Sequence, residues 1–222
     1  MEKVRRIISF DVDGTLVKPE FNDLIWREVI PELYARKNEI EIEEARGFIE
    51  GEYDKIGEYD LRWYSLAFWL DYFRLDVREK EILGEYAGKV SLYPDVLSTL
   101  EKLSKNYQLV IASCMGNDFI DIKLRKRNIK KYFRRVFSAV SIGLIKKEES
   151  FYLALCSSLA IKPGELIHIG DHYEFDYLVP RQIGIRAFYL DRNSGKQKVS
   201  LDGVRSLHDF TRYLCGGEGN SG

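Results

Sequence analysis

The chain has 222 residues, of which 45% are hydrophobic, and a formal net charge of −1. This size accommodates one large domain or a core domain with an insertion. The near-neutral charge, without a basic stripe, argues against a nucleic-acid partner. No stretch approaches the ~20 apolar residues of a membrane span, and no signal peptide is recognisable. Three cysteines without metal-ligand spacing are typical of the reducing cytosol, so we expect a cytoplasmic protein.

The first predicted element is a short apolar run, residues 7–10, which indicates a buried strand. The run ends at Asp11, and Asp13-Gly14-Thr15 is typical of a turn. Turn chemistry explains one of the two aspartates, because Asp and Gly are common in turns. A second carboxylate one residue away adds repulsion unless a cation or a proton is shared. Asp11 and Asp13 are therefore candidate site residues.

The next segment, residues 18–90, predicts an all-helical insertion because no strand pattern interrupts it. Apolar residues at helical spacing predict helices over residues 19–38, 40–59 and 76–90. Residues 60–73 predict one aromatic-rich amphipathic helix that is capped by Asp60. Arg62 and Trp63 in this helix are candidates to reach a substrate.

From residue 95 onward, predicted helices and strands alternate, which indicates a parallel sheet with right-handed crossovers. Helices are expected over residues 95–103, 117–128, 149–160 and 204–214, with Asp95 as the cap of the first. Strands are expected over residues 109–112, 136–142, 166–169 and 186–190. We expect a core domain formed by residues 1–17 and 91–215, a helical cap domain formed by residues 18–90, and a disordered glycine-rich tail at residues 216–222.

Polar side chains follow several of these predicted strands. Parallel strands end at one edge of their sheet, where ligands of such folds bind. The residues expected at that edge are Asp11, Asp13, Ser113, Lys146, Lys147, Asp171 and Asp176. Clustered carboxylates with a hydroxyl and a lysine suit a hard divalent cation together with a phosphoryl group.

The same residues resemble the motifs of the haloacid dehalogenase (HAD) superfamily. Asp11-Val12-Asp13-Gly14-Thr15-Leu16 is similar to its D-x-D-G-T-L motif. Ser113 resembles the second motif, Lys146 in Gly143-Leu144-Ile145-Lys146 the third, and Gly170-Asp171 with Asp176 the fourth. The insertion resembles the C1 cap of that superfamily, so the resemblance spans roughly residues 4–214. It implies a Rossmann-like α/β core with a parallel sheet, an inserted all-helical cap and membership of the phosphatase branch.

Two positions depart from the family pattern. Cys114 stands where Asn is common, and Lys147 follows Lys146 where Pro is usual. Neighbouring side chains in an extended loop point to opposite sides, so one of the two lysines should face the site. In the family, two residues separate a glycine from this lysine, which favours Lys146 after Gly143. An aromatic residue normally follows the lysine by six positions, and Phe151 is closer to that distance from Lys146 than from Lys147.

The resemblance also implies roles. Asp11 would attack phosphorus, and Asp13 would act as the general acid and base. Ser113 and Lys146 would bind phosphoryl oxygens. The cofactor would be Mg²⁺, held by Asp11, the Asp13 carbonyl and Asp171, with Asp176 supporting the metal shell. We therefore expect a Mg²⁺-dependent phosphatase of a small phosphorylated metabolite, either a monomer or a homodimer.

Three alternatives remain at this stage. A 2-haloacid dehalogenase shares the nucleophile and cap type, but such enzymes lack the second aspartate and need no metal, so Asp13 argues against it. A phosphomutase shares every motif and differs in how the cap excludes water. A non-catalytic relative is disfavoured by the intact carboxylate set. His168 is expected to be a hydrogen-bonded core histidine, whereas His172 and Tyr173 lie either at the rim of the site or in an ordinary loop.

Overall fold

A parallel β-sheet forms the centre of the molecule. A computed structural model describes residues 6–192 and 203–216, and in these residues six parallel strands follow the order β3-β2-β1-β4-β5-β6. The strands are β1 (Ile7–Phe10), β2 (Gln108–Ser113), β3 (Phe133–Ser138), β4 (Leu166–Gly170), β5 (Arg186–Leu190) and β6 (Gly203–Val204). This arrangement confirms the predicted α/β fold class with a parallel sheet.

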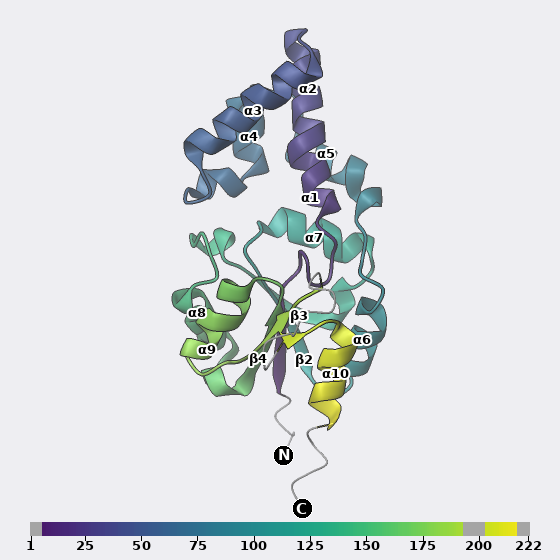
Figure 1. Cartoon of the computed structure of the whole chain (residues 1–222), viewed down its shortest axis with the longest axis vertical. Coiled ribbons are helices and arrows are strands. Elements are labelled where there is room, and N and C mark those ends of the chain that lie inside the picture. Colours follow the sequence, from purple (N-terminus) through teal and green to yellow (C-terminus); the bar gives the residue numbers. More distant parts are fainter. Residues whose placement is uncertain (1–5, 193–202, 217–222) are drawn as a thin grey trace, which may run out of the picture.

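Helices cover both faces of the sheet (Figure 1). One face carries α6 (Val96–Leu103), α7 (Asn117–Lys126) and α10 (Leu207–Gly216), and the other carries α8 (Glu149–Leu159) and α9 (Val179–Gln182). Side chains along each strand alternate between the two faces. Ile8 and Phe10 accordingly belong to the larger apolar cluster, whereas Ile7 belongs to the smaller cluster under α8.

The strand register brings the ends of the three central strands together. Phe10 of β1 is paired with Ile111 of β2 and with Ile169 of β4. The amide of Asp11 donates to the carbonyl oxygen of Ile169 at 3.0 Å, which extends this alignment by one residue. The residues that follow β1, β2 and β4 therefore meet at one edge of the sheet.

The insertion between β1 and β2 consists of helices and lies over this edge, at the top of Figure 1. Its helices are α1 (Glu20–Leu24), η1 (Ile25–Val29), α2 (Ile30–Asn38), α3 (Ile42–Ile56), η2 (Leu61–Tyr64), α4 (Leu66–Tyr72), α5 (Glu79–Tyr86) and η3 (Ala87–Lys89). The chain enters and leaves it at adjacent points, because the amide of Lys18 donates to the carbonyl oxygen of Ser91 at 2.9 Å. The division into domains at residues 17/18 and 90/91 remains a prediction.

The helical insertion and the sheet-bearing part share one apolar cluster. Phe21 and Trp69 from the insertion belong to the same cluster as Phe119 of α7 and Phe10 of β1. The Phe21 and Phe119 rings meet edge to face at 6.2 Å between centroids. We name residues 18–90 the cap and the remainder the core in the following sections.

One predicted helix of the cap is two. Residues 60–73 form η2 and α4, which are separated by Ser65 in an extended conformation. Ser65 accepts a hydrogen bond from the Phe68 amide and so caps α4, which explains the break. The predicted cap at Asp60 is confirmed for η2, because its carboxylate accepts from the Arg62 amide.

Two further regions, residues 133–142 and 203–207, differ from expectation. The third strand is β3 at Phe133–Ser138, and Val140–Ile142 forms the 3₁₀ turn η5 instead of continuing it. Arg134 and Arg135 interrupt the apolar pattern from which a buried strand is predicted. β3 is an edge strand, however, where charged residues are tolerated. Gly203–Val204 forms β6, so the last helix begins at Leu207 instead of Val204.

Asp95 does not cap α6 with its side chain, although it precedes that helix. Its buried carboxylate instead accepts from the amide of Leu207, the first residue of α10, at 2.8 Å. It also forms an ion pair with Arg192 at 3.0 Å. The remaining short helices are η4 (Lys130–Tyr132), η5 (Val140–Ile142), η6 (Pro163–Glu165) and η7 (Tyr173–Leu178).

In residues 6–192 and 203–216, the helices are too short or too polar to span a bilayer. Most of the expected tail, residues 217–222, lies outside the described residues, whereas Gly216 is the last residue of α10. All three cysteines are free thiols.

Candidate active site

A pocket of about 230 Å³ lies where the central strands end beneath the cap. The sequence-predicted residues that line it are Asp11, Asp13, Ser113, Lys146, Lys147, Asp171 and Asp176. The predicted convergence at one edge of the sheet therefore exists in three dimensions. Arg62 and Trp63, the two candidates predicted in the cap, are not part of this lining.

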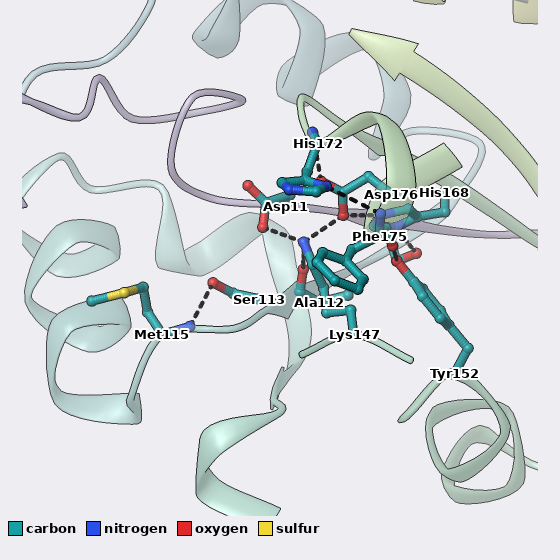
Figure 2. A network of polar contacts seen from close by, with 11 residues as sticks. Asp11, Ala112, Ser113, Met115, Lys147, Tyr152, His168, His172, Phe175 and Asp176 are labelled. Atoms are coloured by element: carbon teal, nitrogen blue, oxygen red, sulfur yellow. Dashed lines mark hydrogen bonds and ion pairs between the residues drawn. The ribbon is translucent and has the colours of Figure 1, made fainter. Parts of the chain in front are cut away.

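Asp11 and Lys147 form the charged centre of the pocket (Figure 2). The Lys147 ammonium donates to Asp11 Oδ1 at 2.6 Å and also forms an ion pair with Asp176. Figure 2 shows the ammonium between the two carboxylates. Only 3% of the Lys147 side chain is exposed, so both carboxylates are needed to offset the burial of its charge.

The structure thus gives Lys147 the position that sequence spacing assigned to Lys146. The Lys146 ammonium instead donates to Glu58 of the cap at 2.7 Å, and it lies over the rings of Tyr64 and Phe175. The expected side-chain alternation is present, but its register is shifted by one residue. Gly143 was a poor reference point, because it ends the η5 turn with a positive φ of 81° and not an extended segment.

Two glycines allow the acidic side chains to approach one another. Gly14 has a φ of +74°, and a Cβ atom built there would lie 1.9 Å from Asp171 Oδ2. A Cβ atom at Gly170 would lie 2.3 Å from the Asp176 carboxyl carbon. Any side chain at either position would displace a carboxylate of the site, so both glycines have a steric role, and Gly14 has a conformational role as well.

Oxygens of Asp11, Asp171 and Asp176 lie within 4.8 Å of one another. Burial raises the pKa of Asp11 well above its ordinary value, and repulsion from Asp176 and Asp171 adds to the rise while Lys147 opposes it. Burial, together with the charge of Asp176, also raises the pKa of Asp171 to about 6. The cluster therefore carries more negative charge than Lys147 compensates, and its hard oxygen donors suit a divalent cation.

Asp176 differs from the other two carboxylates because both of its oxygens already have partners. Oδ1 contacts Lys147 and His168, and Oδ2 accepts from the amide of His172 at 3.0 Å. Burial alone would raise the pKa of Asp176, but Lys147 and the His168 hydrogen bond outweigh burial and lower that pKa. This geometry suits a residue that orients Lys147 and supports the metal shell from behind.

His168 is a buried and hydrogen-bonded core histidine, as the sequence suggested. Its Nδ1 lies 2.7 Å from Ser9 Oγ and its Nε2 lies 2.9 Å from Asp176 Oδ1. Burial lowers the pKa of His168, which favours the neutral ring. His172 lines the pocket, whereas Tyr173 packs against the rings of Tyr177 and Tyr189.

Ser113 ends β2, is buried, and is one of the residues that line the pocket. Its Oγ accepts a hydrogen bond from the Met115 amide at 3.2 Å, as Figure 2 shows. That contact fixes the oxygen while the hydroxyl proton remains able to donate to a bound anion.

The cap contributes Tyr64 and Asn22 to the pocket lining instead of Arg62. Arg62 is paired with the nearby Asp60 at 2.7 Å, and its guanidinium lies over the Phe68 ring. Trp63 contacts Tyr64 edge to face but does not line the pocket. Sequence reasoning missed Tyr64 and Asn22, because neither stands in a recognisable motif.

A second buried lysine contacts the site from α7. Lys123 donates to Asp13 Oδ1 at 2.6 Å, and its side chain is fully buried. The sequence analysis placed Lys123 in the helix expected over residues 117–128 and did not include it among the candidate site residues. A lysine three residues after the apolar pair Phe119-Ile120 was the available signal, because this spacing places it on the same helix face.

The parallel sheet, the inserted helical cap and the carboxylates at the strand ends together define a Rossmann-like hydrolase class. The profile of the haloacid dehalogenase-like hydrolases matches residues 6–184. The chain therefore belongs to the haloacid dehalogenase-like hydrolase family, which confirms the resemblance seen in its motifs.

The individual relatives share less than 30% sequence identity with this chain. The GMP/IMP nucleotidase YrfG of Escherichia coli (strain K12) is 23% identical over 210 residues, which cover 93% of this chain and 93% of that protein. The HAD phosphatase from Thermococcus onnurineus has a similar structure, with a TM-score of 0.81, 27% identity and coverage of 96% of this chain and 99% of that one. A 2-haloacid dehalogenase from Pseudomonas syringae pv. Tomato DC3000 shares the fold, with a TM-score of 0.68, 18% identity and coverage of 96% and 99% of the two chains.

Proposed function

We propose that this protein is a Mg²⁺-dependent phosphatase of small phosphomonoesters that acts through an aspartyl-phosphate at Asp11. The observation that carries the proposal is the contact of Asp11 with Lys147 inside a cluster of three carboxylates. A carboxylate held by an ammonium is a nucleophile with fixed orientation, and the surrounding charges match an anionic substrate with a cation.

Lys147 and Ser113 would bind the phosphoryl group. A carboxylate about 4 Å from one phosphoryl charge is repelled by ~4 kcal/mol at an effective dielectric of 20. The Lys147 ammonium, 2.6 Å from Asp11 Oδ1, lies where it can offset that repulsion. The Ser113 hydroxyl would donate to a second phosphoryl oxygen, since its own oxygen is fixed by the Met115 amide. Lys147 takes the role that the sequence pattern assigned to Lys146.

The carboxylates of Asp11 and Asp171 and the main-chain carbonyl of Asp13 would hold the cation. The raised pKa values of Asp11 and Asp171 support this fit, because repulsion within the cluster contributes to both. When bound, Mg²⁺ would neutralise charge on the nucleophile and on the phosphoryl oxygens. Asp176 would orient Lys147 through their ion pair.

Asp13 would move the proton. It lines the pocket two residues from the nucleophile and on a rigid turn, in which the Leu16 amide donates to the Val12 carbonyl oxygen at 2.8 Å. In the first step Asp13 would protonate the leaving oxygen, and in the second it would accept a proton from the water that attacks the aspartyl-phosphate.

The cavity of about 230 Å³ favours a small leaving group, because pockets for drug-sized ligands are typically ~300–1,000 Å³. Nucleoside monophosphates belong in the substrate panel, because the relative YrfG is a GMP/IMP nucleotidase. The Tyr64 and Phe175 rings in the pocket lining offer apolar surface to such a leaving group.

The test measures phosphate release from p-nitrophenyl phosphate and a panel of sugar phosphates and nucleoside monophosphates. Activity should stop in EDTA and return with Mg²⁺, and Asp11→Asn should lower the rate by at least ~10³. Asp54→Asn, at an exposed position of α3, serves as the control and should match the parent. Full activity in chelator or in Asp11→Asn would contradict the proposed mechanism.

The same assays address the alternatives. Chloride release from a 2-haloacid that exceeds phosphate release would support the dehalogenase instead. Transfer of the phosphoryl group to a second substrate hydroxyl, without free phosphate, would support a phosphomutase.

A further inference from the structure

Lys123 lies outside every motif of the site, yet its charge is buried there. Its side chain is fully buried on α7, and its ammonium lies 5.9 Å from the Phe21 ring centroid and 5.5 Å from the Phe119 ring centroid. Aromatic faces give such a charge only part of the stabilisation it loses on leaving water. The partner that completes its environment is Asp13, at 2.6 Å.

This contact uses one oxygen of Asp13 and leaves the other available. Asp13 Oδ1 accepts from Lys123, whereas Oδ2 is buried and has no hydrogen-bond partner among the described residues. A buried carboxylate oxygen without a donor is rare, because its desolvation remains uncompensated. Asp13 lines the pocket, and Oδ2 is the oxygen that Lys123 does not occupy.

We propose that Lys123 is the positioning residue of Asp13, which anchors Oδ1 so that Oδ2 is presented to the leaving oxygen of the substrate. The inference rests on the proposed phosphatase function and names a residue that the family motifs do not include. With one oxygen held at 2.6 Å, the carboxyl group loses the freedom to rotate away from the reacting atoms.

The proton transfers balance with Asp13 as the only shuttle. As an Asp11 oxygen bonds to phosphorus and the bond from phosphorus to the bridging oxygen breaks, the Oδ2 proton passes to the bridging oxygen. As water then bonds to phosphorus and the Asp11–phosphorus bond breaks, a water proton returns to Oδ2. Lys123 takes part in neither transfer and acts through the orientation of Asp13.

The competing explanation is that the ion pair only stabilises the fold. Lys123 lies near Phe21 of the cap and Phe119 of α7, so the pair could serve to join cap and core. The two explanations differ in their dependence on the leaving group. An alkyl phosphate needs a proton on its leaving oxygen, whereas 2,4-dinitrophenyl phosphate loses a stable phenolate without one. A positioning residue of the general acid therefore affects the first substrate far more than the second.

The experiment compares kcat/KM, which reports on transfer of the phosphoryl group to Asp11, for the best alkyl phosphate of the panel and for 2,4-dinitrophenyl phosphate. Lys123→Met should lower the first value ~30-fold or more and the second less than about threefold. Lys123→Arg should recover part of the loss, because it keeps a donor to Oδ1. Lys126→Met, at an exposed position of the same helix, is the matched control and should change neither value.

A double-mutant cycle links the effect to Asp13. In the Asp13→Asn background, Lys123→Met should lower the alkyl phosphate value by less than about threefold, because residues that act as a unit are not additive. Met fits the apolar surroundings of Lys123, and thermal unfolding should show a folded protein. Lys123→Gln provides a second variant if Lys123→Met does not fold.

Equal losses on both substrates, or additive losses in the double mutant, would overturn this inference and leave the phosphatase function intact. An unmutated protein that releases phosphate from neither substrate would overturn the proposed function, and this inference with it.

Discussion

At the scale of single residues, the neighbours Lys146 and Lys147 have separate environments. Lys147 is buried between Asp11 and Asp176, and these carboxylates raise its pKa well above the ordinary value against the opposing effect of burial. Lys146 faces the cap, where its hydrogen bond lowers the pKa of Glu58. Lys147 is therefore the lysine in contact with Asp11, and under the proposed mechanism its charge would bind the phosphoryl group.

This difference predicts the ranking of two alanine variants. Lys147→Ala should lower the turnover of p-nitrophenyl phosphate by ~10² or more, because it removes an oriented cation from the transition state. Lys146→Ala should remain within about fivefold of the parent, because the charge that it removes is paired with Glu58 of the cap and not with Asp11. Steady-state kinetics of both variants with saturating Mg²⁺ measures the ranking, and the reverse order would restore the assignment that sequence spacing favoured.

Asp171 predicts how metal binding depends on pH. Its pKa of about 6 in the metal-free protein means that the carboxyl holds a proton below that pH, and Mg²⁺ must displace this proton. Between pH 7.5 and pH 5 the affinity for Mg²⁺ should fall about tenfold or more, as titration calorimetry at the two pH values would measure. An affinity that stays constant over this range would contradict the assignment of Asp171 as a ligand.

The same carboxyl sets the sign of a stability change. The folded protein holds the Asp171 proton more tightly than the unfolded chain does, because the folded pKa is the higher one. Raising the pH from about 4 through 6 therefore lowers the free energy of unfolding of the metal-free protein. Added Mg²⁺ should raise the melting temperature more at pH 7.5 than at pH 5, and Asp171→Asn should remove most of this difference.

Site residues that follow a strand within a motif were predictable from the sequence. Contacts between side chains that are far apart in the sequence were not. The carboxyl ends of β1, β2 and β4 bring Asp11, Ser113 and Asp171 into one pocket because their strands are in register. Lys123 reaches Asp13 from another element across 110 residues of sequence. Its spacing from Phe119 and Ile120 places it on the apolar face of the helix, but no local pattern identifies Asp13 as its partner.

At the scale of secondary-structure elements, Asp95 illustrates how a cap can serve a helix far away in the sequence. Its conformation, with φ of −86° and ψ of −5°, is helical, so its side chain is directed away from the first turn of α6. The carboxylate accepts from the Leu207 amide and holds Arg192, which in turn donates to the Thr15 carbonyl oxygen at 2.7 Å. One buried carboxylate thus joins α6, α10 and the turn that follows β1.

This network predicts a large effect for Asp95→Ala. The substitution leaves the Arg192 guanidinium and the Leu207 amide without their buried acceptor, so the free energy of unfolding should fall by ~3–5 kcal/mol. Asp95→Asn should cost less, because its side-chain oxygen can still accept from the Leu207 amide. Urea unfolding measures both values, and Lys102→Ala at an exposed position of α6 is the control. A change below ~1 kcal/mol in Asp95→Ala would show that the network does not stabilise the fold.

The elements themselves were predictable from apolar periodicity wherever they are buried. β2 and β4 follow the expected strands closely, because each contains a run of five buried residues. The third strand was predicted three residues too late, because Arg134 and Arg135 do not follow a buried-strand pattern. The break at Ser65 was missed, because a serine inside a helical pattern does not by itself end a helix. Tertiary context decides such positions.

At the scale of the whole molecule, cap and core meet over the pocket through one prominent ion pair. Glu58 of the cap and Lys146 of the core are in contact at 2.7 Å, and the exposed fractions of their side chains are 53% and 17%. Tyr64 extends this contact, because its ring lies under the Lys146 ammonium and lines the pocket. The position of the cap therefore determines how easily solvent and substrate reach Asp11.

Cys114 offers a direct measurement of cap opening, because this half-buried thiol lines the same pocket. In a Cys215→Ser background, Glu58→Gln should accelerate the labelling of Cys114 by a thiol reagent, since the open form becomes more populated. Because the Glu58 carboxylate is more than half exposed, the pair contributes at most ~1 kcal/mol, which limits the acceleration to about fivefold. Salt at about 1 M should accelerate labelling in the parent and have little effect in Glu58→Gln, because screening weakens the same pair.

Glu44→Gln on the exposed side of α3 and the buried Cys156 are the controls, and neither should respond. Identical labelling rates for the parent and Glu58→Gln at low salt would mean that the apolar contacts shared by Phe21 and Phe119 hold the cap closed without the ion pair.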